Sequence, residues 1–276
     1  MIKSRFLLVL FLVLSVGLQA QKTTKLVILH TNDTHSQVEP VSGKDKGGFA
    51  RRLGVINKIR SEEKNVLLFD AGDFWQGTPY FNFFGGRVEL NALKMMDYDA
   101  VTLGNHEFDN GMDSLATVLK EVSVPIVNVN YNVENTPIKD FVKPYIVIKK
   151  GGLKIGVLGV GVNLRGLAFQ KNYERLILQN PIKPALETSA YLKDTLKCDL
   201  VICLSHLGVS DLDADPTDYD LAAASSKIDV IIGGHSHKMI VNETVKNAEG
   251  KPVIIAQMGK GGENLGRIDL EFEKKK

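Results

Sequence analysis

Short apolar segments rich in β-branched residues alternate with longer segments of helical periodicity along most of this chain. This alternation is typical of α/β proteins, in which helices connect parallel strands. The predicted strands are residues 25–29, 66–69, 100–103, 126–129, 145–149, 154–160, 200–204, 230–232, 253–257 and 266–272. The predicted helices are residues 49–59, 88–96, 112–121, 183–197 and 219–225. We therefore predict an α/β fold with a mostly parallel sheet.

Two regions depart from simple alternation. Residues 145–149 and 154–160 flank the turn sequence Lys150-Gly151-Gly152-Leu153, which predicts an antiparallel hairpin. Residues 253–257 and 266–272 follow each other with no helix between them. A chain of 276 residues suffices for little more than one domain. We expect two stacked sheets in one domain covered by helices, and a single doubly wound sheet is the alternative.

Residues 1–20 have the pattern of a secretory signal peptide. Lys3 and Arg5 provide a positive start, residues 6–14 are apolar, and Ala20 is a small residue at the expected cleavage point. The apolar core is shorter than the roughly 20 residues of a membrane-spanning helix, and no later segment approaches that length. We expect a secreted or periplasmic protein whose mature chain is residues 21–276. A retained membrane anchor is the alternative.

The charge balance of the chain argues against two classes of partner. The chain has 34 basic and 32 acidic residues, and loss of Lys3 and Arg5 would bring its net charge of +2 to zero. This balance favours neither nucleic acid nor a membrane surface as a partner.

Cys198 and Cys203 flank one predicted strand at an odd offset, so their side chains should point to opposite faces. We expect buried free thiols rather than a disulfide.

Five of the predicted strands end in a polar cluster. The clusters are His30–His35, Asp70–Asp73, Asn105-His106, Ser205-His206 and Gly233–His237. Side chains at the carboxyl ends of parallel strands meet at one edge of a sheet, where α/β proteins bind ligands. All six histidines lie in these clusters, five of them as candidate site residues. A single one could be an ordinary loop histidine, but histidines scattered for packing would not gather at strand ends. The clusters therefore predict a metal site.

The donor types suit two divalent ions. Asp33 and His35 are separated by one residue, as are His235 and His237, so in an extended backbone each pair would face one side. Asp73 is the best candidate for a carboxylate shared by two ions. A mixed Asp, Asn and His set without thiolate favours Zn, Mn or Fe. A structural zinc site needs four ligands, whereas seven candidates are present.

In order along the chain, these motifs resemble those of the calcineurin-like metallophosphoesterases. The matching motifs are Asp33-Thr-His35, Gly72-Asp73, Gly104-Asn-His-Glu107, His206 and Gly234-His-Ser-His237. Within that superfamily the secreted 5′-nucleotidases are the most similar branch. The segments that carry this finer resemblance are Asn32–His35, Gly72-Asp73, Gln76-Gly77 and Gly104–Asp109. The resemblance extends from about residue 26 to residue 272.

The resemblance implies a four-layer α-β-β-α sandwich, with two stacked mixed sheets flanked by helices. It also implies two divalent metal ions. One ion would be held by Asp33, His35, Asp73 and His237, and the other by Asp73, Asn105, His206 and His235. Family members often carry Gln at the position of His237, which leaves the preferred metal open. His106, with Asp109 behind it, matches the catalytic pair of the family.

The predicted activity is hydrolysis of phosphate monoesters, above all nucleoside 5′-phosphates. A hydroxide that bridges the two ions would attack, and His106 oriented by Asp109 would stabilise the phosphoryl oxygens and assist the leaving group. A cyclic-nucleotide or other phosphodiesterase, or a hydrolase of a related sulfur-linked oxyanion ester, would use the same metals. A non-catalytic, metal-stabilised binding subunit fits less well, because a binding module needs no leaving-group acid.

Secreted 5′-nucleotidases normally continue into a second domain that holds the nucleoside. The resemblance places only the metal domain in residues 21–276. Either a separate polypeptide would supply a nucleoside-binding domain, or the protein would accept phosphoesters with little base selection.

Several other residues have predicted supporting roles. Residues 259–262, Gly-Lys-Gly-Gly, lack the spacing of a phosphate loop, so we expect a flexible rim loop near the metals with Lys260 as a candidate substrate contact. Glu107 should support its loop by hydrogen bonding, and His30 should be structural. The six aromatic residues at positions 74–84 should contribute to the core, and exposed ones could stack a base or contact another domain.

Overall fold

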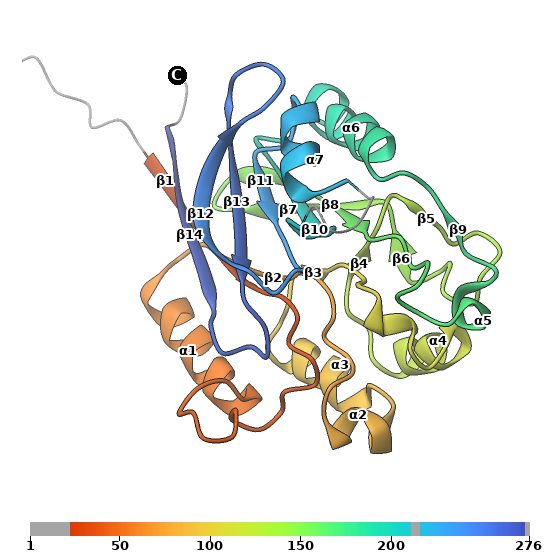
Figure 1. Cartoon of the computed structure of the whole chain (residues 1–276). Helices are drawn as coiled ribbons and strands as arrows, with labels where there is room; N and C mark the ends of the chain where they lie inside the picture. Colours follow the sequence, from red (N-terminus) through yellow and green to blue (C-terminus); the bar gives the residue numbers. More distant parts are fainter. Residues whose placement is uncertain (1–22, 211–215, 274–276) are drawn as a thin grey trace, which may run out of the picture.

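Two six-stranded sheets, stacked face to face, form the centre of the computed structural model (Figure 1), which describes residues 23–210 and 216–273. The first sheet has the order β14-β1-β2-β3-β4-β6, with β14 antiparallel to its neighbour β1 and the other pairs parallel. Its strands are β1 (Thr23–Thr31), β2 (Val66–Asp70), β3 (Ala100–Val101), β4 (Ile126–Val127), β6 (Val142–Lys143) and β14 (Gly266–Glu273).

The second sheet has the order β12-β13-β11-β10-β8-β7, with antiparallel pairs only at its two edges. Its strands are β7 (Tyr145–Lys150), β8 (Leu153–Gly161), β10 (Leu200–His206), β11 (Val230–Ile232), β12 (Met239–Lys246) and β13 (Pro252–Met258). A separate small ribbon pairs β5 (Tyr131–Asn132) with β9 (Ile177–Leu178). Both large sheets are therefore mixed, as expected.

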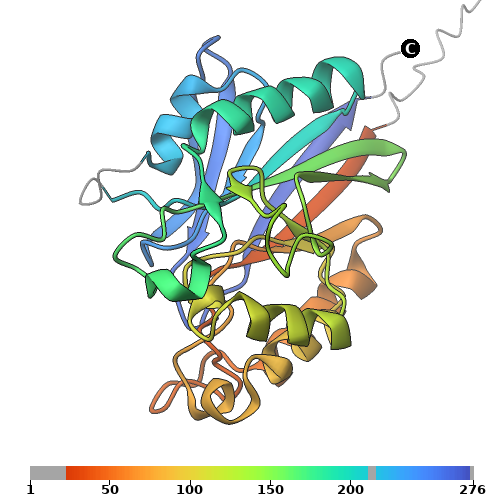
Figure 2. The same ribbon diagram turned by 90° about the vertical axis from the view of Figure 1, so that its right-hand side faces the viewer.

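Helices cover the outer face of each sheet, as the turned view shows (Figure 2). The helices are α1 (Phe49–Glu62), α2 (Pro79–Phe84), α3 (Arg87–Met95), α4 (Met112–Glu121), α5 (Gln170–Tyr173), α6 (Ile182–Ala190) and α7 (Asp218–Ala224). Residues of α1, α3 and α4 pack in one core cluster with the first sheet. Residues of α6 and α7 pack in another with the second sheet. The predicted four-layer sandwich is confirmed.

The alternation of apolar residues along β1 shows why two layers of core form. Leu26 and Ile28 belong to the cluster between the two sheets, whereas Val27 and Leu29 belong to the cluster under the helices. Between the sheets, Gly159 lets the two backbones approach closely, because a Cβ there would lie 2.1 Å from the carbonyl oxygen of Val127. The sheets therefore meet without a side chain between them at this point.

Element boundaries differ from the predictions in places. The predicted helix 183–197 is α-helical only to Ala190 and continues as a π-helical turn, Tyr191–Thr195. The predicted strand 100–103 pairs only at two residues, because the chain turns away to form the loop that carries Asn105. Strand β12 was not predicted, since it is a sheet edge whose mostly exposed positions accept polar residues. The short helix α2 was not predicted either.

Other expectations have clear outcomes. The hairpin at residues 145–160 forms, with Gly151 and Gly152 in the left-handed region. Cys198 and Cys203 are buried free thiols. None of the helices among residues 23–210 and 216–273 is both long and apolar enough to span a membrane. The predicted signal peptide lies outside the described residues.

Candidate metal centre

All seven predicted ligands lie together at the carboxyl edge of the two sheets, at or just beyond the ends of β1, β2, β3, β10 and β11. Three groups of side chains have donor atoms that all lie within 4.8 Å of one another. The groups are Asp33-His35-His237, His35-Asp73-His106 and Asp73-His206-His235. Asp73 and His35 each belong to two groups, so the three groups form one continuous cluster.

The first group surrounds one end of the cluster. Nε2 of His237 lies 3.4 Å from Oδ1 of Asp33 and 3.0 Å from Nε2 of His35. The imidazole rings of His35 and His237 meet edge to face, with their centroids 5.0 Å apart. These three side chains therefore converge from two loops that are about 200 residues apart in the sequence.

The second group surrounds the other end. Nε2 of His206 lies 3.0 Å from Oδ2 of Asp73, and the rings of His206 and His235 have centroids 5.3 Å apart. Asn105 joins this group, because its Oδ1 lies 3.1 Å from Nδ1 of His235. Asp73 thus lies between the two ends of the cluster, in the position expected of a shared carboxylate.

His206 provides the test of whether a metal ion fits. Its Nδ1 hydrogen bonds the carbonyl oxygen of Ala71 at 2.7 Å, so Nδ1 is the donor and Nε2 of the neutral ring carries the lone pair. That Nε2 is buried without a hydrogen-bond partner, although Oδ2 of Asp73 is nearby. When the ring is neutral, two electron-rich atoms face each other here, and a cation between them would satisfy both. The donor set therefore fits a divalent metal ion.

The electrostatics of the metal-free cluster agree with this reading. Burial opposes a charge on His206, but the carboxylates of Asp73 and Asp33 outweigh burial and raise the pKa of His206 to about 10. Burial likewise opposes ionisation of Asp73, yet the neighbouring His206 lowers the pKa of that carboxyl. Without a metal, a proton supplies the positive charge that the two side chains require.

The backbone geometry of the ligands corrects the expectation of extended pairs. Asp33 and His35 have φ values of 47° and 46°, and His235 and His237 have values of 66° and 54°. These residues lie in the left-handed region, which L-residues seldom adopt. The one-residue spacing therefore brings the side chains together through sharp turns rather than an extended strand. Asp73, at 55°, is the fifth such ligand, and this concentration of strained backbone is typical of a functional site.

Glycines allow the loops to pack around the cluster. A Cβ at Gly104 would lie 2.2 Å from Oδ1 of Asp73 and 2.6 Å from Nε2 of His206. At Gly234 it would lie 2.8 Å from Nδ1 of His206. The absence of a side chain at Gly104 and Gly234 therefore lets the backbone come close to the ligands.

Glu107 fixes the positions of two of these loops. Its buried carboxylate accepts hydrogen bonds from the backbone N–H groups of Gly104, Asp73 and Trp75, at 2.6, 3.0 and 3.1 Å. The loops after β2 and β3 are therefore joined through one side chain. This is the supporting role predicted for Glu107.

Sequence reasoning missed two other supporting residues. Asn32 donates to Oδ2 of Asp33 at 2.5 Å and to the carbonyl of Gly259 at 2.7 Å, which links the first ligand to the rim loop. Gln257 accepts hydrogen bonds from Ser236 Oγ and the Lys238 N–H, and so holds the His235–His237 turn. A polar residue next to a ligand, or at the end of an otherwise apolar strand, was the available signal for both.

His106 and Asp109 lie on the loop after β3, as predicted. Nδ1 of His106 is 2.7 Å from Oδ2 of Asp109, and both side chains are partly exposed. Burial opposes protonation of His106, but the hydrogen bond to Asp109 and the nearby Asp73 raise the pKa of His106 above its usual value. The imidazole therefore keeps its proton to a higher pH than an ordinary histidine does, while it remains accessible beside the cluster.

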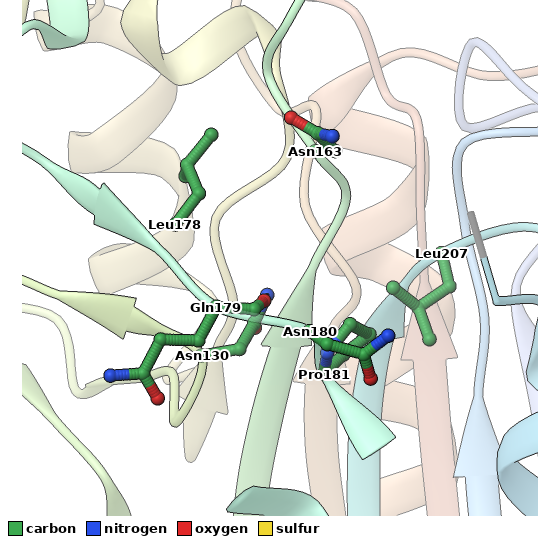
Figure 3. A pocket seen from close by; sticks show the side chains of 7 residues that line it. All are labelled: Asn130, Asn163, Leu178, Gln179, Asn180, Pro181 and Leu207. Carbon is green, nitrogen blue, oxygen red and sulfur yellow. The ribbon is translucent and has the colours of Figure 1, made fainter. Parts of the chain in front are cut away.

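Two pockets adjoin this edge of the sheets. One, of about 390 Å³, is lined by His35, His106 and His237 together with the rim-loop residue Lys260. The other, of about 190 Å³, lies beside Leu207, where side chains from β9 and the ends of β8 and β10 surround it (Figure 3). Asn130 in this second pocket is already engaged with the backbone of Gly161. Of these two pockets, the first opens onto the cluster.

The aromatic residues after Asp73 divide between core and surface. Phe74, Trp75 and Phe81 are buried, whereas Phe83 is 82% exposed and Phe84 is 49% exposed. His30 is fully buried and lies against Gly266, consistent with a structural role. None of these residues lines the pocket on the cluster.

Comparisons with known proteins agree with this geometry. The Metallophos family profile, described as calcineurin-like phosphoesterase, matches residues 26–239. The chain is 32% identical to the trifunctional nucleotide phosphoesterase protein YfkN of Bacillus subtilis, over 91% of this chain and 18% of that protein. It is 32% identical to the snake venom 5′-nucleotidase of Crotalus adamanteus, over 91% of this chain and 46% of that protein.

A solved structure supports the same assignment. The 5′-nucleotidase precursor from Thermus thermophilus superposes with a TM-score of 0.80 at 31% identity, covering 89% of this chain and 51% of that one. The chain thus spans about half of the length of such relatives, or less. The predicted resemblance to 5′-nucleotidases is confirmed, and the Asp and His clusters are of a kind that could bind metal ions. This chain belongs to the calcineurin-like phosphoesterase family.

Proposed function

We propose that the cluster holds two divalent cations, of Zn, Mn or Fe. Asp33, His35, Asp73 and His237 would hold one, and Asp73, Asn105, His206 and His235 the other. The observation that carries this proposal is the convergence of buried donor atoms, with Nε2 of His206 3.0 Å from Oδ2 of Asp73 and His235 in the same group. When bound, the cations supply Lewis acidity, which makes hydroxide available near neutral pH and neutralises charge on a phosphoryl group.

His106 is the proposed catalytic residue of the chain itself. Held by Asp109, its cationic ring can donate from Nε2 to the phosphoryl oxygens and can protonate the departing alkoxide. Replacing His106 with alanine should lower kcat by about 10²–10⁴-fold while both metal ions stay bound. Unchanged turnover would contradict this role.

The proposed reaction is hydrolysis of phosphate monoesters, with nucleoside 5′-phosphates as the main substrates. The 5′-nucleotidase relatives support the substrate class, and the cluster supports the chemistry. The test is metal content measured together with hydrolysis of AMP, a cyclic nucleotide, an aryl phosphate and a sulfate ester. Two equivalents of metal and preferred cleavage of the monoesters are expected. Preferred cleavage of the diester or of the sulfate ester would favour the alternative hydrolases.

Recognition of the base should be weak in this chain alone. The pocket on the cluster has no Phe, Tyr or Trp among the described residues that line it, so it offers no large aromatic face for a base. We propose that a nucleoside-binding domain outside these residues, for example on a separate polypeptide, supplies base recognition, or that substrates are accepted with little base selection. A sub-micromolar KM with strong preference among AMP, GMP, CMP and UMP would contradict both versions.

We also propose that the protein is exported. Lys3, Arg5 and the apolar residues 6–14 support a cleaved signal, which would place the enzyme outside the cytoplasm. N-terminal sequencing of the protein from its native host should begin near Gln21. A sequence that begins at residue 1 or 2 would contradict cleavage.

A further inference from the structure

The rim loop brings a lysine to the pocket that opens onto the cluster. Lys260 is exposed and lines this pocket together with His35, His106 and His237. The pocket volume of about 390 Å³ lies in the range of small-molecule sites, so it has room for more than one phosphoryl group.

The backbone on both sides of Lys260 is fixed to the cluster. The N–H of Gly261 donates to the carbonyl of Asp33 at 2.7 Å, and the carbonyl of Gly259 accepts from the Asn32 side chain at 2.7 Å. The N–H of Gly259 also donates to the carbonyl of Lys238 at 2.9 Å. The position of the Lys260 backbone is therefore set by the same segment that carries the first proposed ligand, which corrects the expectation of a flexible rim loop.

The charge of Lys260 is not neutralised by a protein partner. Among residues 23–210 and 216–273 its ammonium group has neither an ion-pair partner nor a hydrogen-bond partner. Glu263, the carboxylate that lines the same pocket, is already paired with Lys44 at 2.7 Å. A cation with free donors beside a phosphoryl site is suited to bind a second phosphate.

We propose that Lys260 binds the inner phosphate of nucleoside diphosphates, so that the proposed hydrolytic site takes these substrates in addition to monophosphates. Water adds to the terminal phosphorus, the bond from that phosphorus to the bridging oxygen breaks, and the products are inorganic phosphate and the nucleoside monophosphate. Lys260 neutralises the charge that develops on the departing phosphate. A monophosphate has no inner phosphate for Lys260 to contact, and His106 protonates its departing alkoxide, so monophosphates gain little from Lys260. This inference rests on the proposed function.

The experiment compares ADP with AMP as substrates of the metal-loaded protein. Lys260→Gln should lower kcat/KM for ADP by about 10-fold to 100-fold and change the value for AMP by less than about 3-fold, because one charge-assisted interaction is lost. Lys260→Arg should restore most of the ADP activity. Lys46→Gln is the matched control, since Lys46 is an exposed lysine of the neighbouring 41–48 segment that does not line this pocket. It should change neither value.

Binding provides a readout that does not depend on turnover. Calorimetry should show ADP binding more tightly than AMP, with the difference lost in Lys260→Gln. Equal losses for ADP and AMP, or no loss for ADP, would overturn the assignment. If the protein hydrolyses neither nucleotide, the proposed function fails, while the affinity difference between ADP and AMP still decides the role of Lys260.

Discussion

Replacing Gly104 with alanine should disable the metal centre without unfolding the protein. The new methyl group would lie 2.2 Å from Oδ1 of Asp73, whereas real Cβ contacts are not shorter than 3.0 Å. The Asp73 carboxylate must therefore retreat by about 0.8 Å. Misplacement of about 1 Å at a catalytic centre costs about 10²-fold in rate. Since Asp73 is the proposed shared ligand, we expect kcat/KM to fall by about 100-fold.

Alanine substitutions at two further glycines should affect activity to different extents, which tests the same reasoning. A Cβ at Gly234 would lie 2.8 Å from Nδ1 of His206, which requires a much smaller shift, so Gly234→Ala should lose activity but less than Gly104→Ala. Gly54 in α1 has no atom within 4 Å of its would-be Cβ. Gly54→Ala should leave activity unchanged and stabilise the fold by about 0.5–1 kcal/mol.

The assay combines kcat/KM for AMP, metal content and thermal unfolding for all three variants. Gly104→Ala is expected to keep its far-UV circular dichroism while losing activity and metal affinity. If Gly104→Ala retains full metal content and wild-type kcat/KM, the close packing of Gly104 against Asp73 does not position that carboxylate, and the reasoning is refuted. Should Gly104→Ala fail to fold, the ranking of Gly234→Ala below wild type still decides the point.

Three other perturbations have definite expected outcomes. Burial lowers the pKa of His30 from its ordinary 6.5 to about 4. Between these two pH values only the unfolded chain takes up this proton, so the free energy of unfolding should fall by about 3 kcal/mol as the pH falls from 6.5 to 4. Chemical denaturation of the metal-free protein at pH 7 and pH 4.5 should show a smaller loss for His30→Leu, and an equal loss in both proteins would contradict this. Glu107→Gln should destabilise the fold by about 1–3 kcal/mol, because an amide cannot accept hydrogen bonds from all three backbone N–H groups. The control is Glu271→Gln, since Glu271 is exposed. Equal unfolding midpoints for the two variants would count against the assigned hydrogen bonds. Removing metal with a chelator should lower Tm, and added Zn²⁺ or Mn²⁺ should restore it; an unchanged Tm would argue against a tightly held ion.

Local sequence patterns were sufficient to predict most strands and most helices. Residues 25–29 and 200–204 lie inside β1 and β10, because apolar, β-branched runs indicate a buried strand whatever its neighbours are. The same patterns placed the polar clusters at the strand ends. They could not give the edge strand β12, whose exposed side chains carry no burial signal.

The site was predictable as a set of residues but not as a geometry. Asp33, His35 and Asp73 were identified by their positions after strands, yet their left-handed backbone follows from hydrogen bonds between loops, such as Asp33 N–H to the Gly72 carbonyl at 2.9 Å. The roles of Asn32 and Lys260 likewise depend on a contact between segments more than 200 residues apart in the chain.

The sequence by itself determined which segments are strands, which faces they bury and which donor residues gather at their ends, because these properties depend on residues close together in the chain. Apart from the hairpin at residues 145–160, only the tertiary structure decided which strands pair. β13 and β14 are consecutive, yet β13 joins β11 in the second sheet and β14 joins β1 in the first. An alternation of apolar residues specifies that one face of a strand is buried, but not what covers that face. The pairing of strands, and the convergence of loops from both sheets on one cluster, are therefore settled by packing across the whole chain.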